Sequence, residues 1–221
     1  MRYSDWEPIY GQIAKEFGFS AEKDDASASI LDSLVEGKKL LDEARLGSII
    51  GTEATVCGDG PNLDEDLQTF SPRGTLLVAD GATGRLMARR IWPDIIVTDL
   101  DGDVEPQHLA NESGAVMVVL AHGDNLERIK EVVPRLLGPI VPTTQVRPHG
   151  HLSNFGGFTD GDRAVELARH FGARKVNLLG FDFRNPNPVG GKDLERKRRK
   201  LAWARKLIYD LNPPGVVLWS P

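Results

Sequence analysis

Short runs of apolar residues alternate along this chain with longer segments whose apolar positions recur every three or four residues. Runs of this kind, bounded by glycine, proline or acid, are typical of buried strands, and the longer segments are typical of helices that cover a sheet. Their alternation predicts an α/β fold with a doubly wound, mostly parallel sheet. Strands are expected at residues 53–57, 75–79, 94–98, 115–120, 140–146, 175–180 and 216–219.

The first part of the chain lacks such runs and follows the helical pattern throughout. Ser4 has the spacing of a capping box, with a glutamate three residues later, and Ser20 is expected to cap a second helix. A third short helix is expected at residues 38–46. We therefore expect a helical N-terminal extension, residues 1–50, followed by one α/β domain, residues 51–221.

Composition narrows the class of protein. The net charge of −5 leaves no general excess of basic residues, so no nucleic-acid partner is expected. Cys57 is the only cysteine, so an internal disulfide cannot form and a reducing compartment is expected. No apolar run approaches the roughly 20 residues that span a bilayer, and the N-terminus lacks a signal-peptide core. We expect a cytoplasmic protein with small-molecule substrates and no membrane partner; a homo-oligomer is left open.

Acidic residues follow directly after several predicted strands. Asp80 follows the second run, and Asp99, Asp101 and Asp103 follow the third. Ligands in open parallel sheets bind beyond the carboxyl ends of the strands, so these acids are expected at the ligand site. Alternate residues of an extended chain point to one side, so the last three would converge on one cation if the strand geometry continues. Mg²⁺ prefers such oxygen ligands and also binds phosphate.

Two other acidic motifs are partly similar to this segment. A calcium loop that begins at Asp99 would need glycine and glutamate where Val104 and Ala110 stand, so it is excluded. The start of the motif, residues 99–102, is similar to that of haloacid-dehalogenase phosphatases. In that family a threonine occupies the place of Asp103 and the motif lies on the first strand, so the phosphatase is a minor alternative.

The first predicted strand runs into a glycine-rich turn. Gly58 and Gly60 would let the backbone approach a ligand closely, Pro61 suits the first position of a helix, and the free N–H groups would form an anion site. The spacing is close to a dinucleotide fingerprint, although Leu63 stands at the place of its third glycine. By itself the turn is weak evidence for a nucleotide.

Two further acids lie at predicted helix starts. The helix dipole would stabilise the negative charges of Asp124 and Asp162 whatever the function of the protein. For Asp162, a capping role and a ligand-binding role are equally expected. Asp160 is the better candidate for a ligand in its motif. His122 either binds substrate or forms a hydrogen bond within its turn.

The last helix, predicted at about residues 193–211, has one charge on its apolar side. Lys197 lies in a stripe with Leu194, Leu201, Ala204, Ile208 and Leu211. A lysine that faces the body of the protein must pair with an acid or a ligand phosphate, or reach the solvent along the surface.

Taken together, these motifs resemble a known family. Residues 79–82 and 93–101 look like the nucleotide and metal signature of thiamin pyrophosphokinases, and the fuller set is closer to archaeal-type 6-hydroxymethyl-7,8-dihydropterin pyrophosphokinases. That set comprises Gly58–Pro61, Thr98–Asp103, His122–Asn125, Phe155–Ala164 and Gly180–Phe183. The chain has no room after Trp219 for the β-rich substrate domain of thiamin pyrophosphokinases, which favours the pterin branch. Asp59 departs from the neutral residue expected between the glycines.

The resemblance implies a nucleotide-binding catalytic domain that transfers diphosphate from ATP to the pterin hydroxymethyl group with Mg²⁺, releasing AMP. This step belongs to folate or methanopterin biosynthesis. Asp99 and Asp101 would hold the metal, with Lys197 supplying positive charge. The expected metal ligands are Asp99, Asp101, Asp103 and Asp160. The expected ATP- and pterin-binding residues are Gly58, Gly60, Asp80, Gly81, His122, Asp124, Asn154, Phe158, Asp162 and Asp182.

Three alternatives stand beside this hypothesis. Thiamin is the neighbouring acceptor within the same reaction class. A nicotinamide-dependent oxidoreductase would use Asp80 to bind ribose about 20 residues after Gly60. A non-catalytic module would bind ATP without turnover.

Overall fold

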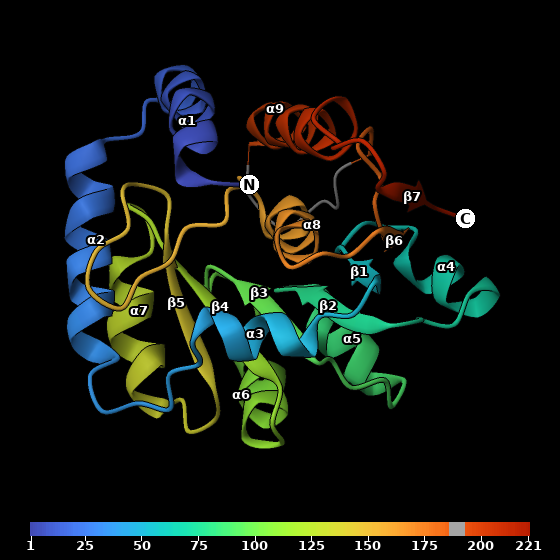
Figure 1. Ribbon diagram of the computed structural model, residues 1–221, viewed down its shortest axis with the longest axis horizontal. Helices are drawn as coiled ribbons and strands as arrows, with labels where there is room; N and C mark the ends of the chain where they lie inside the picture. Colours follow the sequence, from blue (N-terminus) through green and yellow to red (C-terminus); the bar gives the residue numbers. More distant parts are fainter. Residues whose placement is uncertain (186–192) are drawn as a thin grey trace.

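A single parallel sheet forms the centre of the molecule. The computed structural model describes residues 1–185 and 193–221, and across these residues seven strands form one sheet in the order β5-β4-β3-β2-β1-β6-β7 (Figure 1). Every neighbouring pair is parallel, which confirms the predicted α/β fold. The strands are β1 (Glu53–Cys57), β2 (Thr75–Ala79), β3 (Ile95–Thr98), β4 (Val116–Ala121), β5 (Ile140–Thr144), β6 (Lys175–Leu179) and β7 (Val217–Trp219).

Helices cover both faces of this sheet. They are α1 (Tyr3–Phe17), α2 (Ala21–Leu34), α3 (Glu43–Ile49), α4 (Leu63–Thr69), α5 (Ala82–Ala88), α6 (Val104–Glu112), α7 (Leu126–Val132), α8 (Asp160–His170) and α9 (Leu194–Arg205), with a 3₁₀ turn η1 (Val133–Arg135) and a π-helical turn η2 (Lys206–Asp210). None of the helices in the described part of the chain has the length and apolar character needed to span a membrane.

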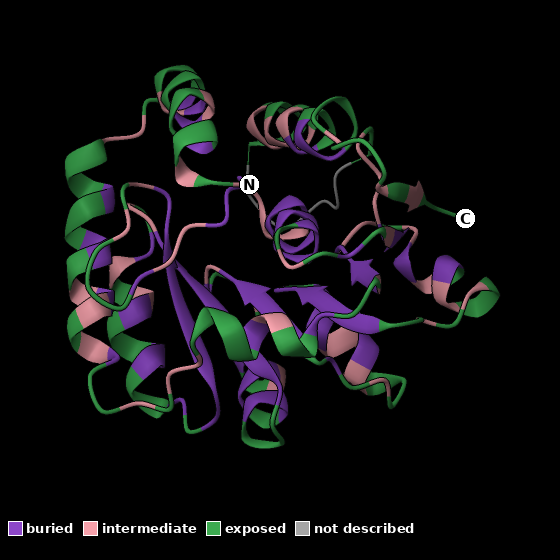
Figure 2. Cartoon of the chain, in the orientation of Figure 1, coloured by how far each residue is buried: buried purple, intermediate pink, exposed green. Residues whose placement is uncertain are grey.

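Alternate residues of β1 to β6 supply the two cores, whereas the edge strand β7 is largely exposed. In β2, Leu77 packs with residues of α3 and α8 on one face, whereas Val78 packs with residues of α4 and α5 on the other. Both faces are therefore buried, as the purple strands in Figure 2 show, which is why the strands read as continuous apolar runs. Pro142 lies in the edge strand β5, as expected, because an edge position tolerates a missing N–H donor.

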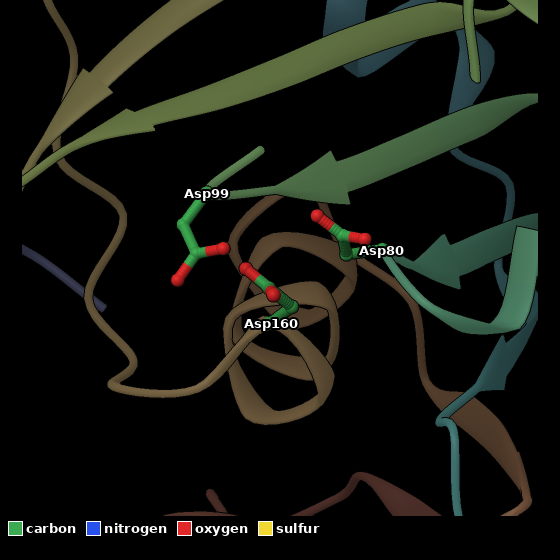
Figure 3. A group of neighbouring side chains, drawn as sticks. All are labelled: Asp80, Asp99 and Asp160. Atoms are coloured by element: carbon green, nitrogen blue, oxygen red, sulfur yellow. The ribbon is translucent and has the colours of Figure 1, made fainter. Parts of the chain in front are cut away.

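The chain order explains where α8 lies. From β1 the chain moves outward to β5 and then returns through α8 to β6, on the other side of β1. Helix α8 packs across β1, β2 and β3 on this return. Its first turn consequently meets the loops that follow β2 and β3, which are the loops with the predicted acids (Figure 3).

The N-terminal helices differ in detail from the predicted ones. Arg2 is the N-cap of α1, so Ser4 lies inside the helix and its predicted capping role is wrong. Ser20 does cap α2, through the N–H of Lys23. Helix α3 begins only at Glu43, because Leu40 first forms a β-bridge with Ile140 along the edge of the sheet.

Candidate metal centre

Asp80 occupies a buried position directly after β2. Its carboxylate accepts hydrogen bonds from Thr98 Oγ1 at 2.6 Å and from Gln107 Nε2 at 3.0 Å, and the residue is only 4% exposed. Burial, with the neighbouring charges of Asp99 and Asp101, raises the pKa of Asp80 to about 6. One donor from the end of β3 and one from α6 therefore fix a carboxylate that is costly to ionise.

Asp99 follows β3 and has a different electrostatic environment. Its Oδ2 lies 3.4 Å from His122 Nε2, and its Oδ1 accepts a hydrogen bond from the backbone N–H of Asp101 at 3.1 Å. Burial alone would raise the pKa of Asp99, but the His122 contact and this hydrogen bond outweigh it and lower the pKa to about 2. Asp99 is thus ionised at neutral pH.

The chain does not continue as a strand beyond Thr98, and this separates the three alternating acids. Leu100 adopts a left-handed conformation with φ of 67°, so the alternation that would have aligned the acids is lost. Asp103 becomes the N-cap of α6 and accepts a hydrogen bond from Glu105 N at 3.2 Å. The predicted convergence of Asp103 on the same cation is therefore wrong. Asp101 is exposed, and its charge contributes to the raised pKa values of Asp80 and Asp160.

Asp160 is the first residue of α8 and contributes the third carboxylate. Its Oδ1 accepts a hydrogen bond from Arg163 Nη1 at 3.1 Å, and Arg163 in turn donates to Thr143 Oγ1 at 2.8 Å. Burial, followed by the charge of Asp99, raises the pKa of Asp160 well above its ordinary value. Arg163 is 6% exposed, and its positive charge partly balances that of Asp160.

The carboxylates of Asp80 and Asp99, which follow β2 and β3, and that of Asp160, at the start of α8, point toward one another (Figure 3). One oxygen from each lies within 4.8 Å of the others. Three carboxylates at this separation repel each other unless protons or a cation compensate, and the raised pKa values of Asp80 and Asp160 are the result of that repulsion and of burial. An all-oxygen donor set of this kind fits Mg²⁺. We refer to these three residues as the acid triad.

The loop that follows β4 closes one side of the acid triad. Besides the His122 contact, Asn125 donates its side-chain amide to the carbonyl oxygen of Asp99 at 2.8 Å. His122 Nδ1 accepts a hydrogen bond from the N–H of Asp124, which is the role expected within the turn, and its Nε2 faces Asp99. Binding of substrate by His122 stays a prediction. Asp124 itself is exposed.

The glycine-rich turn after β1 has a different role from the predicted one. The N–H of Gly58 donates to the carbonyl of Leu179 at 2.8 Å, and that of Gly60 donates to the carbonyl of Gly180 at 2.7 Å. These two N–H groups are therefore not available to the anion site that was predicted for this turn. A Cβ on Gly60 would lie 2.4 Å from the Gly180 oxygen, so glycine is required here by a neighbouring loop. Pro61 also precedes the helix, because α4 begins at Leu63.

Other predicted residues also serve local structure. Asp162 is fully buried and accepts hydrogen bonds from the N–H groups of Phe158 and Thr159, which makes it half of a capping box and not a ligand-binding residue. Gly81 lies at the N-cap of α5, where a Cβ would be 2.6 Å from Asp59 Oδ2. Asp182 accepts hydrogen bonds from Arg184 N and from Asn185.

The remaining candidates lie around the N-terminal helices and α9. Asn154 bonds to the backbone of its own loop, and Phe158 packs against Phe17 of α1 with ring centroids 5.3 Å apart. Lys197 is partly buried on α9. Of the apolar stripe predicted for the last helix, Ala204 and Ile208 are buried as expected. The prediction is wrong at the two ends of the stripe, because Leu194 and Leu211 are exposed.

Sequence reasoning missed residues that support the acid triad. Thr98 and Gln107 hold Asp80, and neither type of side chain is distinctive in sequence. Arg163 had a recognisable signal, since a basic residue three positions after an acid lies on the same side of a helix. Gly102 also supports the triad, because a Cβ there would be 1.9 Å from Asp80 Oδ1, a contact that only the structure reveals.

Comparison with known proteins gives a consistent set of relatives. The family model described as 6-hydroxymethylpterin diphosphokinase MptE-like matches residues 29–188. The chain is 42% identical to the 6-hydroxymethyl-7,8-dihydropterin pyrophosphokinase of Pyrococcus furiosus, over 97% of this chain and 96% of that protein. The proteins of the same name from Methanocaldococcus jannaschii and Methanothermobacter thermautotrophicus are 39% and 42% identical, over 94% and 96% of this chain and 95% and 96% of their own lengths.

Proposed function

The chain belongs to the 6-hydroxymethylpterin diphosphokinase MptE-like family, and from this premise we propose that it transfers diphosphate from ATP to 6-hydroxymethyl-7,8-dihydropterin with the aid of Mg²⁺. The observation that carries the proposal is the acid triad, in which Asp80, Asp99 and Asp160 offer oxygens within 4.8 Å of one another at the carboxyl edge of the sheet. The product would serve folate or methanopterin biosynthesis.

The proposed reaction is a displacement at the β-phosphorus of ATP. The hydroxymethyl oxygen of the pterin forms a bond to this phosphorus, and the bond from the phosphorus to the oxygen that bridges to the α-phosphate breaks. AMP leaves with that oxygen, and the hydroxyl proton is released. Such transfers depend on positioning and on neutralising phosphate charge, and they need little covalent chemistry from the protein.

The three carboxylates of the acid triad differ in how readily they ionise. Asp99, with its lowered pKa, is ionised at neutral pH, whereas Asp80 and Asp160 lose their protons less readily. Bound Mg²⁺ would neutralise charge on the phosphates and offset the repulsion among the carboxylates. We propose Asp101 as a further ligand, because its backbone N–H donates to Asp99 Oδ1 at 3.1 Å, which keeps it beside the acid triad. Lys197 is proposed to add positive charge toward the triphosphate.

The test is a product assay with matched variants. Purified protein, ATP, Mg²⁺ and the reduced pterin should yield AMP and the pterin diphosphate in equal amounts. Asp99→Asn should abolish turnover with the fold kept, whereas Asp103→Asn, at the exposed helix cap, should keep it. Absence of AMP above background in the wild-type protein would reject the proposal, and full activity of Asp99→Asn would reject the metal site.

The same assay separates the alternatives. Thiamin offered in place of the pterin tests the neighbouring acceptor, and ATP binding without turnover of either would indicate a non-catalytic module. The nicotinamide-dependent oxidoreductase is disfavoured, because the N–H groups of Gly58 and Gly60 are bonded to carbonyls at the end of β6 and after it; tight NAD binding without Mg²⁺ would support it.

A further inference from the structure

A buried carboxylate of the N-terminal helices holds the loop that carries His122. The N–H of Gly123 donates to Asp24 Oδ1 at 2.7 Å, although 99 positions separate these residues in the chain. The other oxygen of Asp24 accepts a hydrogen bond from the hydroxyl of Tyr10 in α1. Asp24 is only 2% exposed, so both bonds are shielded from water.

The loop held in this way is in direct contact with the acid triad. His122 immediately precedes Gly123, and its Nε2 lies 3.4 Å from Asp99 Oδ2. On the far side of the loop, Asn125 donates to the backbone carbonyl of Asp99 at 2.8 Å and to that of Leu120 at 2.7 Å. A displacement of Gly123 would therefore move His122 relative to Asp99.

The packing of α2 on this loop leaves little space. A Cβ built on Gly123 would lie 2.7 Å from the Cβ of Lys23 and 3.4 Å from Asp24 Oδ1. Glycine is thus required at position 123 because α2 lies directly against its backbone. The helix and the loop form one closely packed unit, and the hydrogen bond of Asp24 fixes their relative position.

We propose that Asp24 is a positioning residue of the metal site, which acts through Gly123 to keep His122 against Asp99. The proposal rests on the proposed function of the acid triad as a metal site, and it gives the N-terminal helices a part in that function. Without Asp24 the N–H of Gly123 loses its acceptor and the loop moves away from Asp99. Partners that orient metal ligands in this way typically contribute about 10- to 100-fold to metal affinity or activity.

The experiment measures metal binding directly, with Mn²⁺ as the probe and the signal of free Mn²⁺ in electron paramagnetic resonance as the readout. Asp24→Ala should weaken Mn²⁺ binding about tenfold. Asp24→Asn keeps an acceptor for Gly123 and should bind close to the wild-type value. Leu31→Ala, which removes a fully buried side chain of the same helix, should lower thermal stability and leave Mn²⁺ affinity unchanged.

A double-mutant cycle tests the route of the effect. If Asp24 acts through His122, then Asp24→Ala should cause no further loss of Mn²⁺ affinity in a His122→Ala background. If Asp24→Ala does not fold, Tyr10→Phe, which removes only the second hydrogen bond of Asp24, should still weaken binding in the same direction.

The outcomes separate this inference from the proposed function. A wild-type protein that binds no Mn²⁺ would refute the metal site and this inference with it. A wild-type protein that binds Mn²⁺ while Asp24→Ala, or Tyr10→Phe in its place, binds it equally well would refute the positioning role alone. Weakening by Leu31→Ala to the same extent would also refute it, because general destabilisation would then explain the effect.

Discussion

Replacing Asp80 with asparagine should make the metal-free protein more stable at neutral pH while it destroys the metal site. In the wild-type protein the buried carboxylate of Asp80 is ionised at pH 7.5 beside Asp99, although burial raises its pKa to about 6. Asparagine has nearly the same shape and carries no charge. It removes the electrostatic cost together with the metal ligand.

The magnitude follows from the pKa. The rise from 3.8 to about 6 corresponds to about 3 kcal/mol, at 1.36 kcal/mol per pKa unit. The pKa of Asp80 in the folded protein lies above its value in the unfolded chain. Between pH 3.8 and about pH 6 the folded protein therefore binds more protons than the unfolded chain does. Its stability falls as the pH rises through this window. The cost is fully present at pH 7.5 and absent below about pH 3.8.

The hydrogen bonds of Asp80 allow the substitution. Thr98 can continue to donate to the asparagine oxygen, and the new amide can donate to Gln107 Oε1, which is buried without a partner among the described residues. For this the amide of Gln107 must rotate and lose its bond to the carbonyl of Asp103. Such a bond contributes about 1 kcal/mol, so a net gain of about 2 kcal/mol is expected.

Urea unfolding in the presence of a chelator measures this gain. The free energy of unfolding of Asp80→Asn should exceed that of the wild type by about 2 kcal/mol at pH 7.5. Below about pH 3.5, where Asp80 is largely protonated in both states, only the loss of the Gln107 hydrogen bond remains, so the variant should be less stable than the wild type by about 1 kcal/mol. A variant less stable than the wild type at pH 7.5 would refute the claim that ionised Asp80 destabilises the metal-free protein.

Three further predictions concern metal linkage and local packing. Mg²⁺ should raise the melting temperature more at pH 7.5 than at pH 5, because protons compete for Asp80 and Asp160; equal shifts would contradict competition. Gly60→Ala should lower the free energy of unfolding by roughly 1–3 kcal/mol, since its Cβ meets a carbonyl oxygen at 2.4 Å. Its control, Gly11→Ala in open space on α1, should raise stability by up to about 1 kcal/mol in the same urea titration. Asp162→Ala should cost at least about 2 kcal/mol in thermal unfolding, because it leaves two N–H groups without their acceptor, and an unchanged melting temperature would exclude the capping role.

The sequence by itself determined the strands and the edge of the sheet at which acid collects. Short apolar runs bounded by glycine, proline or acid are local signals, and the strand β5 with its proline was recognised even at the edge. The rule that ligands bind beyond the carboxyl ends of parallel strands pointed to Asp80 and Asp99. Asp160 was expected from its own motif and from the family resemblance, and all three lie together in the structure. These inferences succeeded because each depends on a few neighbouring residues and on a general property of parallel sheets.

Only the tertiary structure decided which residues face the site. The left-handed turn at Leu100 directs Asp103 to a helix cap, and alternation in the sequence gives no warning of that turn. Glycine is required at position 60 because the carbonyl oxygen of Gly180 lies against it. The proposed role of the N-terminal helices depends on the hydrogen bond between Asp24 and Gly123. Local propensity acts over a few residues, whereas these contacts join segments about a hundred positions apart, which only the packed chain brings together.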